Sequence, residues 1–293
     1  MAVPDDSCNE SRGIGGFLRS LLSGIPWSER AQSEESMQLE RPPGGGLRID
    51  NANGRTRIVG EDREDLEIQV EKTARAESEE EAERLLQAIR VLTRRDAAGD
   101  LEVEVEIPGR WNRKGRVDLD LHVPRDLGRV QVMASNGRVC IEGMRGRVRA
   151  KSANGPVRVS DVVGDVEIHT SNAKVCTRCT CGSLVARSSN GKIELEEHRG
   201  GVDAATSNGT IVCEIEDVGK SGVQLATSNG RIVLELPEDT DGDVDIRVDN
   251  GLIRTARELT RCARESSGRL KGTLGRGGTP IRLRASNGTV NLR

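Results

Sequence analysis

Apolar and polar residues alternate in short runs that repeat along most of the chain, and each pair of runs is joined by Ser-Asn-Gly or a close relative. The Asn of this turn recurs at positions 136, 154, 172, 190, 208, 229, 250 and 287, with an earlier copy at Asn53. The spacings from 136 onward are 18, 18, 18, 18, 21, 21 and 37 residues. Apolar residues stand six and four positions before the Asn and three and five after it. This period-two alternation predicts two short strands hinged at each turn.

The constant spacing favours a solenoid over other arrangements of these strands. A second Gly follows the Asn by ten residues at Gly146, Gly164, Gly182 and Gly200, and it marks the return turn. We predict an all-β, parallel β-helix-like solenoid with 18 to 21 residues per coil, in which equivalent residues stack in columns one strand spacing apart. The alternative is an antiparallel β-meander or sandwich, in which Asn-Gly forms hairpin turns.

Residues 47–127 predict a β-rich region that precedes the regular coils. Strands are expected at Leu47–Asp50, Arg55–Val59, Leu66–Thr73, Leu101–Ile107 and Arg116–Val123. Between them, residues 77–90 predict a helix, because Ser78 is a good N-cap, three Glu follow it, and an apolar stripe comes next. A solenoid must cover its open ends, so we expect this helix to act as a cap.

The remaining segments complete the expected organisation. Residues 1–27 form an N-terminal tail with a short amphipathic helix that could anchor at a membrane surface or partner through residues 13–27. Residues 28–46 are polar and rich in Pro and Gly, which predicts a flexible linker. Residues 128–293 hold the solenoid repeats, with an insertion at 257–278 before a final coil.

Composition excludes several classes of function. Aromatic residues make up only 1% of the chain, with no Tyr and one Phe. Carbohydrate-active enzymes and single-strand nucleic-acid binders stack their ligands on aromatic rings, so nucleic acid and small-molecule substrates are not expected. We find no paired-carboxylate, Ser/His/Asp or phosphate-loop motif. We therefore expect no enzymatic activity and no cofactor.

The sequence also gives expectations about location. No run of 18 apolar residues is present, and the first ten residues lack the features of a secretory signal. Seven Cys spread through the chain do not resemble the disulfide framework of a small secreted domain. We expect a cytoplasmic protein, peripheral to the membrane if the tail anchors it, or a cell-surface protein if a leader precedes this sequence.

The Asn-Gly turns are the first candidate site, and we interpret them as structural. Asn tolerates the left-handed conformation and Gly adopts it freely, and stacked amides can bond to the next coil. The predicted turn ladder comprises Asn136, Gly137, Asn154, Gly155, Asn172, Asn190, Gly191, Asn208, Gly209, Asn229, Gly230, Asn250, Gly251, Asn287 and Gly288.

Basic residues flank the turns at two outward positions, two residues after the Asn and three before it. Stacked like charges repel unless something relieves them. Acidic residues on the outer faces could do so, and so could an anionic partner. The candidate anion-binding residues are Arg138, Lys151, Lys174, Arg187, Lys192, Arg231, Arg247 and Arg284.

One cluster has metal-ligand chemistry. Stacking would place His198 about one coil from Cys179 and Cys181, and Cys176 could supply a fourth zinc ligand. The C-x-x-C-x-C spacing without a second pair is a weak zinc motif, and free thiols are the alternative.

The chain resembles the bacterial "putative adhesin" family of unknown function, which carries Toastrack repeats. The resemblance runs from about Leu47 to Arg293, and it rests on the Asn-Ala-Asn-Gly start, the serial Ser-Asn-Gly units and the closing stretch to Val290. It implies a β-solenoid in a bacterial, often envelope-linked, context.

Together these observations favour a non-enzymatic scaffold or adhesin-like binding module that contacts protein or anionic polymer through its long repeat face. Two alternatives remain open. One is a membrane-associated envelope-stress regulator, and the other is a β-helix enzyme that acts on acidic polysaccharide.

Overall fold

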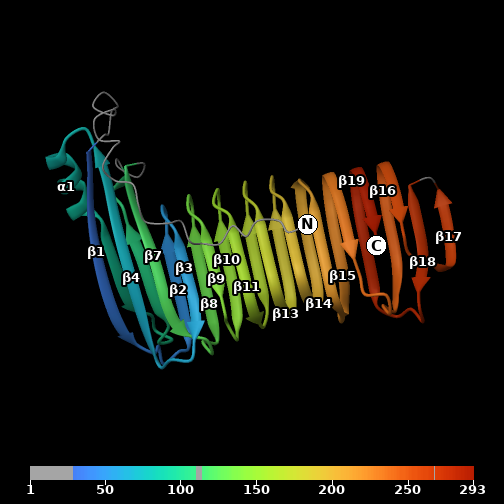
Figure 1. Cartoon of the computed structure of the whole chain (residues 1–293), viewed down its shortest axis with the longest axis horizontal. Coiled ribbons are helices and arrows are strands. Elements are labelled where there is room, and N and C mark those ends of the chain that lie inside the picture. The colour runs from blue at the N-terminus through green and yellow to red at the C-terminus, as the bar shows by residue number, and fades with distance from the viewer. Residues whose placement is uncertain (1–28, 110–113, 267) are drawn as a thin grey trace, which may run out of the picture.

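The computed structural model describes residues 29–109, 114–266 and 268–293. In this part of the chain, 19 strands and one helix form an elongated stack (Figure 1). The predicted tail helix and the possible anchor at residues 13–27 lie outside the described residues. None of the described helical segments has the length and hydropathy needed to cross a bilayer.

Each repeat forms two strand segments, one before and one after its Asn-Gly turn. We call the segments before the turns the leading layer and those after the turns the trailing layer. Several strands run through the turn and belong to both layers. The repeat strands are β8 (Arg129–Ala134), β9 (Val139–Glu142), β10 (Arg147–Ser152), β11 (Val157–Val163), β12 (Val166–Thr170), β13 (Val175–Ser188), β14 (Ile193–Asn208), β15 (Ile211–Glu235), β16 (Gly242–Thr255) and β19 (Pro280–Leu292).

Equivalent positions of successive repeats lie side by side in parallel pairs. Val157 pairs with Val175, and Val175 pairs with Ile193, with all three strands running in the same direction. The predicted solenoid is confirmed, and the antiparallel meander is wrong. The apolar columns of both layers join one continuous buried cluster, because each coil's inward side chains need the neighbouring coils to cover them.

The N-terminal end consists of segments that leave the repeat pattern. Its strands are β1 (Glu29–Glu40), β2 (Gly46–Asn51), β3 (Thr56–Glu61), β4 (Asp65–Ala76), β5 (Arg90–Arg95), β6 (Leu101–Glu106) and β7 (Gly115–Pro124). β2 and β3 form a coil beside β8 and β9, and β6 and β7 lie on its other side. Antiparallel strands then close both layers. β5 pairs with β6, β4 pairs with β7, and β1 pairs with β4.

β1 corrects the prediction of a flexible linker at 28–46. Residues 29–40 form a 12-residue strand in register with β4 over its whole length. Only Met37 and Leu39 of this strand pack against the core as partly buried apolar residues. The strand is therefore held by its pairing with β4 and not by its own hydrophobic pattern, and the sequence pattern alone did not indicate it.

The one helix in the described residues is α1 (Glu79–Ala88), inside the predicted range 77–90. The Ser78 hydroxyl accepts a hydrogen bond from the Glu81 N–H at 3.2 Å, which confirms the predicted N-cap. The helix packs on β1 and β4 through Ala82 and Leu85. It lies at the N-terminal end of the stack, as expected of a cap (Figure 1).

At the other end, the order of the coils in space differs from their order in sequence. The coil of Asn287 in β19 pairs with β15 on one side and with β16 on the other. β19 therefore fills a rung between two earlier coils, and the expectation that it completes a final coil is wrong. The insertion at 257–278 contains β17 (Thr260–Ser266) and β18 (Arg269–Leu274), an antiparallel hairpin that closes the leading layer against β16.

Candidate functional site

The Asn side chains form a continuous hydrogen-bonded ladder along one edge of the solenoid. Each Asn after Asn136 donates its side-chain Nδ2 to the Oδ1 of the Asn on the preceding rung, at distances from 2.8 to 3.1 Å. The order of rungs is Asn136, Asn154, Asn172, Asn190, Asn208, Asn229, Asn287 and Asn250. The geometry agrees with the structural interpretation of the turns, because these amides are engaged with one another.

The reason for Gly after the Asn is only partly the one expected, because among the predicted ladder glycines only Gly251 and Gly288 have a positive φ, of 151°. Among the described residues, no ladder Asn has a positive φ. Gly is needed because a Cβ on Gly155 or Gly230 would lie 1.7 or 1.8 Å from the carbonyl oxygen of the Gly one rung before. Left-handed backbone at residues other than Gly occurs three positions before the return-turn glycines, at Asp161, Cys179 and Glu197, with φ of 54°, 50° and 52°.

The predicted basic residues lie on both sides of this Asn edge and do not form one ridge. Arg138, Lys174, Lys192 and Arg231 belong to the trailing layer, whereas Lys151, Arg187, Arg284 and Arg247 belong to the leading layer. The two groups face different surfaces because the chain reverses at the turn between them.

Acidic neighbours neutralise part of the trailing group. The Nζ atoms of Lys174 and Lys192 both contact the Glu194 carboxylate. Burial acts to raise the pKa of Glu194, but the hydrogen bonds from the two lysines hold that pKa below its usual range. Arg138 and Arg231 are exposed and have no ion pair among the described residues.

The leading group lines a trough that runs along the solenoid. We define the basic row as Lys151, His169, Arg187, Arg284 and Arg247, which occupy one outward column together with Ala205 and Ala226. A parallel row of exposed hydroxyls runs beside the Asn edge. Its members are Ser171, Ser189, Ser207, Ser228 and Ser286. Hollows of about 530 and 430 Å³ lie between the two rows.

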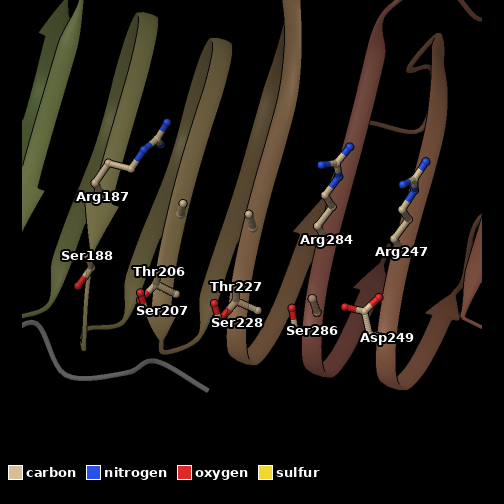
Figure 2. Close-up of a pocket in the computed structure, with 13 residues that line it drawn as sticks. Arg187, Ser188, Thr206, Ser207, Thr227, Ser228, Arg247, Asp249, Arg284 and Ser286 are labelled. Atoms are coloured by element: carbon tan, nitrogen blue, oxygen red, sulfur yellow. The ribbon is translucent and has the colours of Figure 1, made fainter.

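The larger hollow exists because two consecutive coils carry Ala where their neighbours carry Arg. Arg187 stands at one end of Ala205 and Ala226, and Arg284 and Arg247 stand at the other. In Figure 2 the three guanidinium groups point to the same side, while the labelled Ser and Thr side chains form the opposite side. Arg187 and Arg284 are three rungs apart, or about 14 Å at the usual strand spacing. Sequence reasoning missed this hollow, although the two alanines in the basic column were its signal.

The three arginines differ in how far they are neutralised. Arg187 contacts the Asp203 carboxylate and donates to the Asp203 carbonyl at 2.7 Å. Arg247 lies 3.7 Å from Asp245, which also holds Arg269 at 3.2 Å. Arg284 is exposed and forms no ion pair within the described ranges. The Arg284 and Arg247 end of the hollow therefore holds one arginine without an ion pair, and the Asp249 carboxylate lines the opposite side of this end.

The predicted thiol and imidazole cluster does not converge on one point. His198 is only 1% exposed, and its Nδ1 lies 2.8 Å from the Thr180 hydroxyl. The Cys179 thiol instead donates to Glu197 at 2.7 Å, which raises the pKa of Cys179 to about 11 and disfavours the thiolate that zinc requires. Burial raises the pKa of Cys176. Across the described residues, no group of three or more His, Cys, Asp or Glu is placed to hold a metal.

Three solved structures are similar to this chain at low identity. They are described as a "putative adhesin" from Bacteroides fragilis, another from Parabacteroides distasonis, and a "putative cell adhesion protein" from Clostridium sporogenes. Their identities are 12%, 9% and 13%, with TM-scores of 0.49, 0.40 and 0.28. Each alignment covers 89% of this chain, and it covers 97%, 97% and 99% of the other chain. No curated protein matches the sequence.

A family-level match covers nearly the whole described fold. The sequence pattern of the Toastrack DUF4097 family matches residues 46–293. This range includes every coil from Asn53 to Asn287 and both strands of the C-terminal hairpin. The chain therefore belongs to the Toastrack DUF4097 family.

Proposed function

We propose that the chain is a non-enzymatic, adhesin-like binding scaffold whose trough in the leading layer holds an extended anionic polymer. The observation that carries this proposal is the pair of parallel rows, one basic and one of hydroxyl groups, that follow the solenoid for successive rungs. Both rows follow the rungs at the strand spacing of about 4.8 Å, and the basic row is interrupted only at Ala205 and Ala226, so a linear ligand meets basic groups on one side and hydroxyls on the other along the trough.

The chemistry of the trough supports an anionic ligand. Guanidinium groups bind carboxylate and phosphate oxygens through paired, charge-assisted hydrogen bonds. Arg284 is available for this because it is exposed and forms no ion pair among the described residues, and Arg247, at 3.7 Å from Asp245, stands beside it in the same column. The serine hydroxyls opposite can donate to or accept from the polar groups along the polymer.

The shape of the trough supports a polymer over a small molecule. The two hollows are open and continuous along the rungs, and they share Arg187 and Ser188. Sites for small ligands bury most of the ligand in a largely apolar pocket, and this surface is shallow and polar. The name "adhesin" borne by the similar structures fits a contact role of this kind.

Binding to two polyanions tests the proposal. Poly-L-glutamate presents carboxylates and inorganic polyphosphate presents phosphates, so the pair also identifies the preferred anion. We expect the double variant Arg284→Ala with Arg247→Ala to weaken binding at least roughly tenfold, the effect of losing about one charge-assisted hydrogen bond. Added salt should weaken binding by the intact protein.

The matched control is Arg138→Ala with Arg231→Ala, which removes two exposed arginines across the Asn edge. This control should bind as the intact protein does. Equal loss in both double variants would show a general charge effect and would remove the trough from consideration, and so would the absence of binding to either polymer.

A further inference from the structure

The trailing layer ends at β16 without a covering strand. β18 pairs with β16 only from Gly242 to Arg247, and the last backbone bond on this side runs from the Val248 N–H to the Gly268 carbonyl at 2.8 Å. The rest of β16 pairs with β19 on its inner side through Thr255. Among the described residues, no strand lies against its outer side.

Along the open segment, alternate residues direct their backbone N–H and carbonyl groups to the outer side. In the interior coils, the N–H three residues after the Asn donates to a carbonyl of the next coil at 2.9 to 3.0 Å, from Val139, Val157, Val175 and Ile193. Ile253 holds this position in the outermost coil, where no next coil follows. In a parallel ladder, alternate residues point both backbone groups to the same side. Gly251, Ile253 and Thr255 therefore present three N–H and three carbonyl groups to the open side.

Side chains at the same rung are also incompletely covered. Leu252 is 57% exposed, and it is one of two large apolar side chains in the described residues that are exposed to solvent. Ile253 is only partly buried, whereas its column partner Val290 is fully buried. An unpaired strand edge with exposed apolar side chains is a template for another strand.

The other three layer ends show which strand direction this solenoid uses for closure. β5 closes the leading layer and β4 closes the trailing layer at the N-terminal end, and β18 closes the leading layer at the opposite end. Each of these strands is antiparallel to the one it covers. The open edge of β16 is therefore expected to take an antiparallel strand.

We infer that the outer edge of Gly251–Thr255 is a strand-addition site for an extended acidic peptide segment of a protein partner. Arg254 is exposed and forms no ion pair within the described residues, so it favours an acidic residue opposite. Leu252 favours an apolar residue opposite, two positions away on the same face. The inward residues of the added strand would be apolar, because they would cover Ile253 and the end of the core.

A second copy of this chain does not fit the same edge. If β16 paired with β16 of a second copy across a two-fold axis, the leading layers of the two copies would also face each other at the same rungs. The β17 and β18 hairpin extends two strands beyond β16 in that layer (Figure 1). The two hairpins would then occupy the same space.

Peptide binding with amide hydrogen exchange tests the site. The probe is an acetylated, amidated peptide with the core Val-Glu-Val-Leu-Val, flanked by Ser, which places Glu opposite Arg254 and Leu opposite Leu252 in antiparallel pairing. The reversed core Val-Leu-Val-Glu-Val tests the strand direction, and Val-Lys-Val-Leu-Val tests the charge. In the free protein, the amides of Gly251, Ile253 and Thr255 should exchange quickly, and the first peptide should slow them at least tenfold.

Two variants separate backbone pairing from charge. Ile253→Pro removes an outward N–H and should abolish peptide protection. Arg254→Glu leaves the backbone intact, and it should weaken the Glu peptide at least tenfold and favour the Lys peptide. Arg138→Glu, an exposed site on the same layer far from this edge, is the matched control and should bind normally.

Several results would overturn the inference. Slow exchange of the three amides in the free protein would show that the edge is already covered. If that protection disappears on deleting residues 1–28, the chain's own tail is the occupant. If it rises with protein concentration, a second copy is the occupant. Unchanged peptide binding by both variants would also place the peptide elsewhere.

Discussion

The two ends of the solenoid are closed to different extents. At the N-terminal end, antiparallel strands cover both layers and α1 packs on β1 and β4. At the opposite end, a hairpin covers the leading layer, while the trailing layer ends in an open strand among the described residues. At three of the four layer ends the stack stops where the strand direction reverses, and at the fourth it stops at a parallel strand with an open edge among the described residues.

The Asn ladder shows the same difference. At the N-terminal end, the Asn53 amide donates to the Gly115 carbonyl at 2.6 Å, a backbone group of β7. At the other end, Asn250 donates inward to Asn287, and its own Oδ1 has no further rung to accept from. The Asn one coil before the ladder therefore bonds to the backbone, whereas the Oδ1 of the last ladder Asn points away from the stack.

The largest expected difference between the ends comes from deleting strands. Removing residues 279–293 deletes β19 and leaves a gap of one rung between β15 and β16. We expect loss of cooperative folding in β16 to β18, because coils are stable only against adjacent coils. Of the described elements, removing residues 1–40 deletes only the edge strand β1, and it should lower the melting temperature without unfolding the repeats. Hydrogen exchange resolved by segment measures both, and equal damage from the two deletions would contradict the inserted-rung arrangement.

A pair of isoleucines compares packing at the two ends of the trailing layer. Ile68 on β4 is fully buried, whereas Ile253 on β16 is partly buried. Ile68→Ala should lower the free energy of unfolding by about 2 to 5 kcal/mol, the usual range for a buried site. Ile253→Ala should cost about 1 kcal/mol, because less apolar surface is lost from the core. Denaturant unfolding measures both, and similar values would mean that the β16 end is covered as well as the β4 end.

The Asn ladder provides a smaller comparison between the middle and the end. Asn190 both donates and accepts a ladder bond, and Asn250 only donates one. With a net contribution of about 0.5 to 1.5 kcal/mol per hydrogen bond, Asn190→Ala should destabilise the protein about twice as much as Asn250→Ala. The same denaturant assay compares them. A larger effect at Asn250 would show that its outward amide oxygen has a partner.

The smallest expected effect is a pH dependence of stability, and the residue responsible for it lies between the two ends. Burial lowers the pKa of His198, so the folded state holds this imidazole neutral. In the unfolded chain, the imidazole binds a proton with its ordinary pKa of about 6.5. Stability from His198 is therefore complete above that pH and decreases as pH falls below it. Unfolding of His198→Gln between pH 7 and 5 should be flatter than that of the intact protein, and parallel curves would argue against a buried neutral imidazole.

The sequence predicted the repeats well because their information is local and recurrent. Val157, Val175 and Ile193 fall in one column as soon as the 18-residue period is seen. The position of β19 was not predictable, since the spacing of 37 residues from Asn250 to Asn287 does not indicate on which side the later coil packs. β1 was missed for a related reason, because its partner β4 supplies its stability.

The candidate site was predicted in part. The sequence identified the basic residues, but it grouped the two sides of the Asn edge together. The reversal of the chain at each turn separates Lys174 and Lys192 from Arg187 and Arg284. Which charges are compensated depends in part on cross-rung contacts such as that of Glu194 with Lys174. Those contacts follow from the stacking register and not from adjacency in sequence.

The inserted position of β19 also constrains how the protein is made. The ribosome produces β16, β17 and β18 before β19, although β19 lies inside them in the finished stack. Coils from Asn136 to Asn229 can assemble in the order of their synthesis. The last three strands to emerge before β19 must stay undocked, or open again, until the later strand arrives. Translation rate and chaperone access over this stretch therefore bear on whether the molecule closes correctly.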